Sequence, residues 1–302
     1  IPDDHIIKFA FDSAEDLIKI GENPIVLDNE KEDRKVDPSR FINWLMPQIN
    51  GEGMYYLLLD EVQKLGAFES VLNGFLRKDN LDVYVTGSNS KFLSKDILTE
   101  FEGRGDEVHV LPLSFSEYYA FKQGDRSEAY DDCSVYGGLP AVVLMATEEQ
   151  KTNYLISQMR NLYLRDIVNR YSVQDETVHA EVMDVIASGI STLTNPRKIA
   201  STMNTVHGTK ICDATVDRYI GYAEEAFMLT RVKRYNVKGR KYIGTPYKIY
   251  FEDVGLRNAR LSFRQIEGTH IMENIIYNEL RYRGYQVDVG TVESREKDTD
   301  GK

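Results

Sequence analysis

Two adjacent carboxylates and an uncharged polar pair are the residues of this chain whose types and spacing could support chemistry on a phosphate. Asp60 and Glu61 directly follow an apolar run, and Ser88 and Asn89 follow a second apolar segment further along the chain. At the carboxyl end of a strand in an open α/β sheet, an Asp can hold Mg²⁺ and a neighbouring Glu can polarise the water that attacks a γ-phosphate. The amide of Asn89 could hydrogen-bond both that water and a phosphate oxygen. The pattern therefore predicts Mg²⁺-dependent chemistry on a nucleotide.

Each of these signals also has a purely structural interpretation. An apolar strand can simply end in a solvated acidic turn, and Gly-Ser-Asn is a common turn sequence. Arg104, flanked by glycines, could stabilise transition-state charge or could be a surface arginine in a turn. We predict Glu61, Asn89 and Arg104 to be catalytic residues. We predict Asp60 and Ser88 to bind the nucleotide, with Asp60 holding the Mg²⁺, while the structural alternatives stay open.

The elements that would position these residues alternate over the first third of the chain. Short apolar runs predict strands at residues 5–11, 54–59, 82–86 and 107–111. Capping residues and apolar spacing predict helices at 14–20, 68–76 and 91–101, and another that Pro38 opens and Pro47 ends. This alternation is typical of a parallel, doubly wound sheet. We expect the uninterrupted run 54–59 to be buried on both faces of that sheet.

Composition and charge narrow the class of protein. The chain has 302 residues, 42% of them hydrophobic and 28% charged, as expected for a globular protein of two or three domains. No apolar run is long enough to cross a membrane, and two distant cysteines with five scattered histidines make no metal-binding spacing. We therefore expect a cytoplasmic protein. The net charge of −11 argues against a surface that coats nucleic acid, but it permits a local basic patch.

A series of motifs in fixed order resembles the bacterial and archaeal AAA-like P-loop ATPases that carry a further C-terminal region. The motifs lie at residues 55–63, 83–94, 102–106, 111–117, 136–140, 163–167 and 272–280. The resemblance implies ATP and Mg²⁺ as cofactors and a P-loop upstream of Ile1. No Gly-x-x-x-x-Gly-Lys-[Ser/Thr] sequence occurs in the chain. We therefore expect an internal piece of a longer polypeptide, inactive as an ATPase by itself.

The chain beyond residue 112 is expected to be rich in helices at first, and then to form a unit that contains both helices and strands. Helices are predicted at 114–121 and 148–171, with a Gly-Gly-Leu-Pro turn at 136–140. Two further helices, at 195–203 and 214–227, precede two strands, at 229–237 and 247–252, and this order predicts a winged helix. We therefore predict four regions: an ATPase α/β domain (1–125), a helical lid (126–175), a winged helix (176–262) and the start of a C-terminal α/β domain (263–302).

The predicted hairpin of the winged helix carries a run of cations with tyrosines between them. Such a stripe favours contact with a nucleic-acid backbone, although a solvated hairpin is the alternative. The preceding helix is acidic, so we expect little sequence specificity or a protein-docking role. By resemblance the last region opens a nuclease-like domain, in which Glu273 would join a metal site, but Glu273 has no partner in the sequence. The candidate nucleic-acid contacts are Lys233, Arg234, Lys238, Arg240 and Lys241.

Two functions from different classes fit these observations. The first is an ATPase that, when full length, couples its nucleotide state to a winged helix in contact with nucleic acid or a protein partner. The second is a non-hydrolysing DNA-binding or scaffold protein that keeps the ATPase fold. The joint presence of Glu61, Asn89 and Arg104 favours the first. Assembly into an oligomer stays open.

Overall fold

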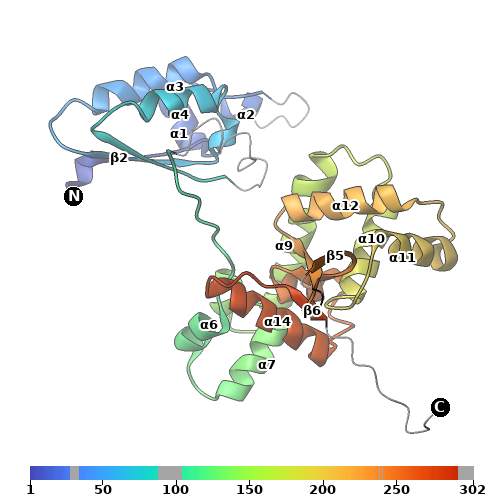
Figure 1. The fold of residues 1–302 in the computed structure, drawn as a ribbon. Helices are drawn as coiled ribbons and strands as arrows, with labels where there is room; N and C mark the ends of the chain where they lie inside the picture. Colours follow the sequence, from blue (N-terminus) through green and yellow to red (C-terminus); the bar gives the residue numbers. More distant parts are fainter. Residues whose placement is uncertain (28–33, 88–103, 238, 240, 292–302) are drawn as a thin grey trace, which may run out of the picture. The chain divides into compact units, whose positions relative to one another are not determined.

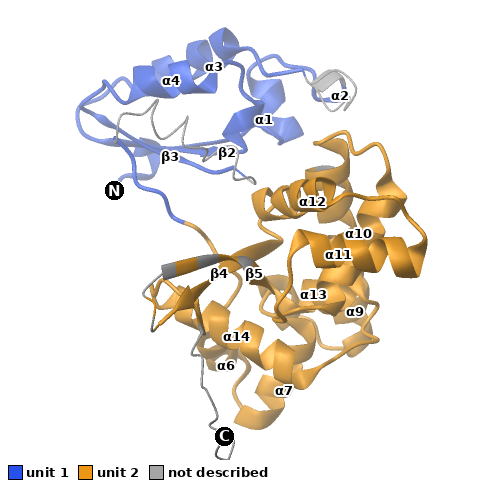
Figure 2. Ribbon diagram, turned by 45° about the vertical axis from the view of Figure 1, so that its right-hand side comes forward, with its two compact units in different colours: residues 1–108 blue, residues 109–302 orange. Residues whose placement is uncertain are grey.

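The protein folds into two compact units, residues 1–108 and 109–302 (Figures 1 and 2). The computed structural model describes residues 1–27, 34–87, 104–237, 239 and 241–291. Within these residues, no helix is both long and apolar enough to span a membrane. Ser88, Asn89 and the predicted helix 91–101 lie outside the described residues.

The first unit is built on a three-stranded parallel sheet in the order β1-β2-β3. Ala10 pairs with Asp60, and Leu59 pairs with Val85, so the three strands end at one edge. This confirms the predicted parallel α/β arrangement and the predicted strands at its centre. The strands are β1 (Ile6–Ala10), β2 (Tyr55–Asp60) and β3 (Leu81–Val85).

Two helices of this unit, α1 and α3, begin where the capping residues predict. The side chain of Ser13 accepts from the amide of Asp16 at the start of α1, and Asp37 accepts from the amide of Ser39, 2.8 Å away, at the start of α3. The unit contains α1 (Ala14–Lys19), α2 (Pro24–Leu27), α3 (Pro38–Leu45), α4 (Phe68–Phe75) and the 3₁₀ turns Asp3–His5, Met46–Gln48 and Val62–Lys64.

Among the described residues, one face of the sheet is largely buried and the other is partly exposed. Alternate strand residues such as Phe9 and Leu57 pack with α1, α3 and α4 in one apolar cluster, and Figure 2 shows α3 and α4 over the same side of the sheet. On the opposite face Leu58 is 37% exposed and Tyr84 is 55% exposed. The prediction that 54–59 is buried on both faces is therefore wrong for the described residues. The doubly wound arrangement stays a prediction.

The predicted strand at 107–111 is not formed. Its residues pair with no described strand, and the side chains of Val108 and Val110 are 80% and 85% exposed. An apolar pattern alone cannot make a strand, because the backbone groups of a strand need a partner.

The second unit is mainly helical and contains a small mixed sheet in the order β5-β4-β6. β4 and β5 are antiparallel, whereas β6 is parallel to β4. Its elements are α6 (Phe115–Lys122), α7 (Arg126–Tyr136), α8 (Pro140–Val143), α9 (Glu148–Asn161), the π-helix Leu162–Asn169, α10 (Glu176–Ser188), α11 (Pro196–Thr202), the π-helix Met203–His207, α12 (Asp213–Glu225), β4 (Leu229–Asn236), β5 (Lys241–Phe251), α13 (Val254–Arg260), α14 (Gly268–Tyr282) and β6 (Val289–Thr291).

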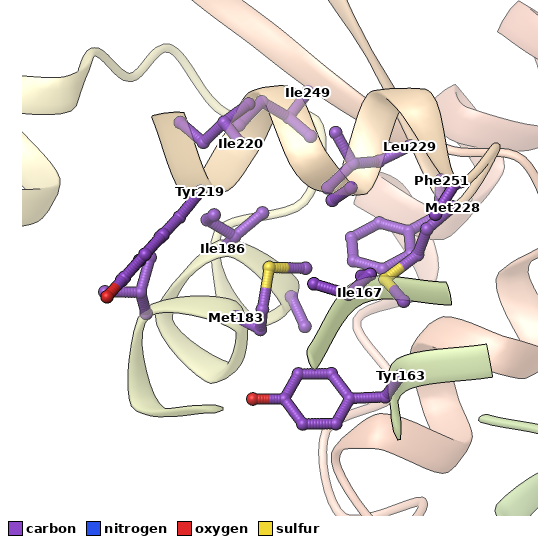
Figure 3. Packing of buried hydrophobic residues seen from close by; sticks show 14 of the residues in the cluster. Tyr163, Ile167, Met183, Ile186, Tyr219, Ile220, Met228, Leu229, Ile249 and Phe251 are labelled. Atoms are coloured by element: carbon purple, nitrogen blue, oxygen red, sulfur yellow. The ribbon is translucent and has the colours of Figure 1, made fainter. Parts of the chain in front are cut away.

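The core of this unit joins α9, α10 and α12 to the hairpin. Figure 3 shows Tyr163, Ile167, Met183 and Ile220 in one cluster. Val216, Tyr219, Ile220 and Ala223, the predicted apolar face of α12, are all buried, which confirms that prediction.

The hairpin is longer than the sequence predicts. β5 starts at Lys241, whereas residues 238–246 were expected to form a loop. The register shifts between Val232 and Arg234, and Pro246, which has no N–H for the ladder, lies in the unpaired stretch of β5. Tyr247 pairs instead with Thr194, through backbone hydrogen bonds of 2.8 and 2.9 Å.

A close approach of two backbone segments is a tight constraint on the second unit. A Cβ on Gly255 would lie 2.1 Å from the carbonyl oxygen of Tyr136, so α13 packs against the end of α7 only because this residue is a glycine. Asp253, just before α13, accepts from the amide of Gly138 at 2.7 Å and ties the same two segments.

We expect Gly255→Ala to destabilise the protein by about 2 kcal/mol or more, because the added methyl group overlaps backbone atoms. The matched control is Gly221→Ala in α12, where a Cβ would meet nothing within 4 Å. That change should raise stability by about 0.5–1 kcal/mol, the usual gain for alanine in a helix. Urea unfolding followed by circular dichroism measures both, and a destabilisation of equal size in the two variants would contradict the packing argument.

A buried histidine makes the stability of this unit sensitive to acid. His179 is fully buried, and its Nδ1 lies 2.9 Å from the hydroxyl of Tyr163. Burial, with a smaller contribution from the cation of Arg260, lowers the pKa of His179 to about 4. The native protein therefore holds a neutral ring in a pH range where the unfolded chain takes up a proton.

We expect this histidine to stabilise the fold fully above its unfolded pKa of 6.5 and to lose up to about 3 kcal/mol as the pH falls towards 4. Urea unfolding between pH 7 and 4.5 should show a smaller loss of stability for His179→Gln than for the native chain. The exposed His109 supplies the control, His109→Gln. Identical pH profiles for all three proteins would contradict the assignment.

Candidate functional site

The carboxyl edge of the parallel sheet brings Asp60 beside Thr86. Asp60 ends β2 with its side chain exposed, and its backbone oxygen accepts from the amide of Phe11 at 3.0 Å. The amide of Thr86 donates to the oxygen of Leu59 at 2.8 Å, which continues the pairing of β2 and β3 by one residue. The hydroxyl of Thr86 can then donate to Oδ1 of Asp60. The carboxylate is thereby oriented at the edge where open α/β sheets bind ligands.

Glu61 follows in an unusual backbone conformation. Its φ of 52° and ψ of 44° lie in the left-handed region, which costs a residue with a side chain on the order of 1–3 kcal/mol. The amide of Glu61 donates to Oγ1 of Thr86 at 3.4 Å, and the amide of Val62 donates to the oxygen of Thr86 at 3.2 Å. Thr86 therefore holds both the strained backbone and the neighbouring carboxylate of Asp60.

The predicted site residues are only partly brought together. Asp60 and Glu61 lie at the sheet edge as predicted, whereas Ser88 and Asn89 fall outside the described residues. Arg104 is exposed, and its guanidinium donates to Oδ1 of Asn73 in α4 at 3.3 Å. The assignments of Arg104, Ser88 and Asn89 therefore stay predictions.

Thr86 is a site residue that the sequence analysis missed. In the sequence it is the last residue of a predicted strand, and nothing in its type points to a ligand. The signal that could have found it is the register, because residues that end neighbouring parallel strands meet at the same edge.

The donor set at this edge fits Mg²⁺ bound together with a nucleotide. The described residues contain no group of three or more His, Cys, Asp or Glu that could hold a metal ion alone. Mg²⁺ commonly keeps several waters and takes only one or two carboxylates, together with phosphate oxygens. One oriented carboxylate, that of Asp60, meets this need.

The hairpin of the second unit presents fewer free cations than the sequence suggested. Lys248 forms an ion pair with Glu273 of α14 at 2.6 Å, and the hydroxyl of Tyr250 donates to the same oxygen at 2.7 Å. Glu273 is thus held in an ion pair, and its proposed place in a metal site stays a prediction. Lys233 is exposed and Arg234 is half-buried, while Lys238, Arg240 and the side chain of Lys241 lie outside the description.

Two acidic residues of α12 contact the hairpin. Arg231 of β4 donates from Nε to Glu224 at 2.7 Å, and its Nη1 lies 2.5 Å from Asp217. These carboxylates therefore hold α12 against β4. The single positive charge of Arg231 offsets part of the negative charge of these two carboxylates.

Comparison with known protein families assigns the first unit. Residues 11–119 match the family described as "AAA domain", and residues 127–267 match a domain of unknown function, DUF8612. The match over residues 11–119 supports an AAA-like P-loop ATPase domain in this part of the chain. The AAA-like region contains the whole sheet edge with Asp60, Glu61 and Thr86.

The chain is also similar to two curated proteins and to a solved structure. An uncharacterised protein of Haemophilus influenzae is 33% identical over 248 residues, covering 80% of this chain and 62% of that protein. Another, from Methanocaldococcus jannaschii, is 27% identical over 241 residues, covering 76% of this chain and 53% of that protein. The chain thus spans between half and two thirds of the length of these relatives. A Walker-type ATPase of Pyrococcus abyssi shares the fold, with a TM-score of 0.54 at 12% identity over 85% of this chain and 91% of that one.

Proposed function

We propose that the AAA-like unit hydrolyses ATP with Mg²⁺ when it is joined to a P-loop, and that its nucleotide state controls the second unit. The observation that carries this proposal is the carboxyl edge of the sheet. There Asp60 is oriented by Thr86, and Glu61 is held in a strained conformation beside it. Strained residues of this kind are typical of functional sites.

Each residue has a role that its position supports. Asp60 would hold the Mg²⁺, which when bound supplies charge neutralisation at the β- and γ-phosphates. Glu61 would accept a proton from the attacking water. Ser88, Asn89 and Arg104 are proposed to contact the γ-phosphate or its water, as in other ATPases of this kind.

The alternative is a scaffold that keeps the fold without hydrolysis. The adjacent carboxylates of Asp60 and Glu61 at the edge of the sheet, with Asp60 oriented by Thr86, favour the enzyme.

We expect Glu61→Gln in the longer, P-loop-containing polypeptide to retain ATP binding while the hydrolysis rate falls by roughly two or more orders of magnitude, as loss of a general base typically causes. The variant keeps the shape of the side chain but cannot accept a proton. Glu52→Gln, at an exposed position of the same unit, is the control. Phosphate release and nucleotide calorimetry measure the two effects, and near-native turnover would remove Glu61 from the mechanism.

We further propose that residues 176–262 form a winged helix that contacts nucleic acid. The chain order supports this: α10, the bridge at Thr194, α11, α12 and then the hairpin. Pairing of Thr194 with β5 supplies the short strand that a winged helix places between its first two helices. Two more of the predicted regions are proposed on the sequence alone. They are a helical lid at 126–175 and a C-terminal domain that begins at 263.

We expect reversal of Lys238, Arg240 and Lys241 to Glu to weaken binding equally for two unrelated DNA duplexes. Each cation that neutralises a phosphate contributes about −0.9 to the slope of log affinity against log salt, so the slope should flatten by about two to three units. Fluorescence anisotropy across a salt series measures both quantities.

The control for this experiment reverses three exposed cations of the first unit, Lys8, Arg77 and Lys78, for the same change in net charge. Equal losses in the two triple variants would show that net charge alone matters. Unchanged affinity after the hairpin reversal would favour a protein partner instead.

A further inference from the structure

Gln63 lies two residues after Glu61 and reaches back to it. Its side-chain amide donates to Oε2 of Glu61. The 3₁₀ turn Val62–Lys64 that carries Gln63 is fixed by its neighbours, because Val62 is fully buried and Leu65 is 1% exposed. The donor therefore comes from a well-anchored backbone.

The contact restrains the carboxylate of Glu61, whereas Thr86 contacts the backbone of Glu61. Thr86 accepts from the backbone amide of Glu61, whereas Gln63 holds its carboxylate. Backbone and side chain of the glutamate are thus held from two different elements, the end of β3 and the turn after β2.

The side chain of Gln63 is not the one that packing alone would favour at this position. Its Oε1 is buried and has no hydrogen-bond partner among the described residues. Burying a polar atom without a partner is unfavourable because the atom loses its hydrogen bonds to water, and an apolar side chain of similar size would avoid that cost. The useful part of this glutamine is therefore its amide donor to Glu61.

We propose that Gln63 is a positioning residue that orients the Glu61 carboxylate towards the attacking water. This inference rests on the proposed ATPase function. Misplacement of a catalytic group by about 1 Å can cost up to 10²-fold in rate, so a single donor to the general base is enough to matter. In this proposal Gln63 acts through Glu61.

The experiment is a double-mutant cycle on ATP hydrolysis in the longer, P-loop-containing polypeptide. Gln63→Leu removes the donor and the unpartnered oxygen together. We expect kcat to fall about tenfold, KM for ATP to stay within twofold, and the melting temperature to stay equal or rise. In the Glu61→Gln background the same substitution should change kcat less than twofold, because residues that act as a unit are not additive.

Controls separate this role from a general packing effect. Gln63→Met, which lacks the donor but keeps the length of the side chain, should reproduce the loss if Gln63→Leu fails to fold. Gln48→Leu, at an exposed glutamine whose amide donates to the oxygen of Trp44 at 2.9 Å, should leave kcat unchanged.

Two results would overturn the inference: an unchanged kcat in Gln63→Leu and Gln63→Met, or an equal fold-loss in the native and Glu61→Gln backgrounds. Native turnover in Glu61→Gln alone would instead defeat the proposed function. The failure of Gln63 as a positioning residue and the failure of Glu61 as the base are therefore distinguishable.

Discussion

The parallel pairing of β1, β2 and β3 is the constraint on which the candidate site depends. Parallel strands end together, so the residue that closes β2 and the residue that follows β3 become neighbours although 26 positions separate them in the chain. The hydroxyl of Thr86 then meets the carboxylate of Asp60, and the turn that leaves β2 places Glu61 beside them. A single shift of register would turn Asp60 to the buried face of the sheet, where an unpaired carboxylate is costly. Sheet geometry, rather than local sequence, thus assembles the acidic edge.

In the second unit, ion pairs join the hairpin to the helices on both sides of it. Arg231 ties β4 to α12 through Glu224, and Lys248 ties β5 to α14 through Glu273. Arg281 of α14 adds a bidentate contact to Glu252, with both distances 2.8 Å. These partly buried pairs use charges that the sequence alone presents as free for a ligand. A nucleic-acid contact in this unit therefore depends on the hairpin cations outside these ion pairs. Among the hairpin cations whose side chains the structure describes, Lys233 is exposed.

Local signals allowed much of the fold to be predicted, and the failures have a common physical cause. The caps at Ser13 and Asp37, the buried face of α12 and the strand that ends at Asp60 depend on neighbours in sequence, and each was found. The strand expected at 107–111 and the role of Thr86 depend on residues distant in the chain. Side-chain type and spacing carry no information on such partners, so the acids of the site were predicted while the group that orients them was not.

The measurement that tests the account most directly is the Mg²⁺ dependence of ATP affinity in the longer, P-loop-containing polypeptide, compared between the native protein and Asp60→Asn. Calorimetric titrations with and without Mg²⁺ give four dissociation constants. If Asp60 holds the metal at the edge of the sheet, Mg²⁺ should tighten ATP binding markedly in the native protein and little in the variant, while metal-free affinities stay similar. An equal gain from Mg²⁺ in both proteins would contradict the assignment of this edge as the metal and nucleotide site.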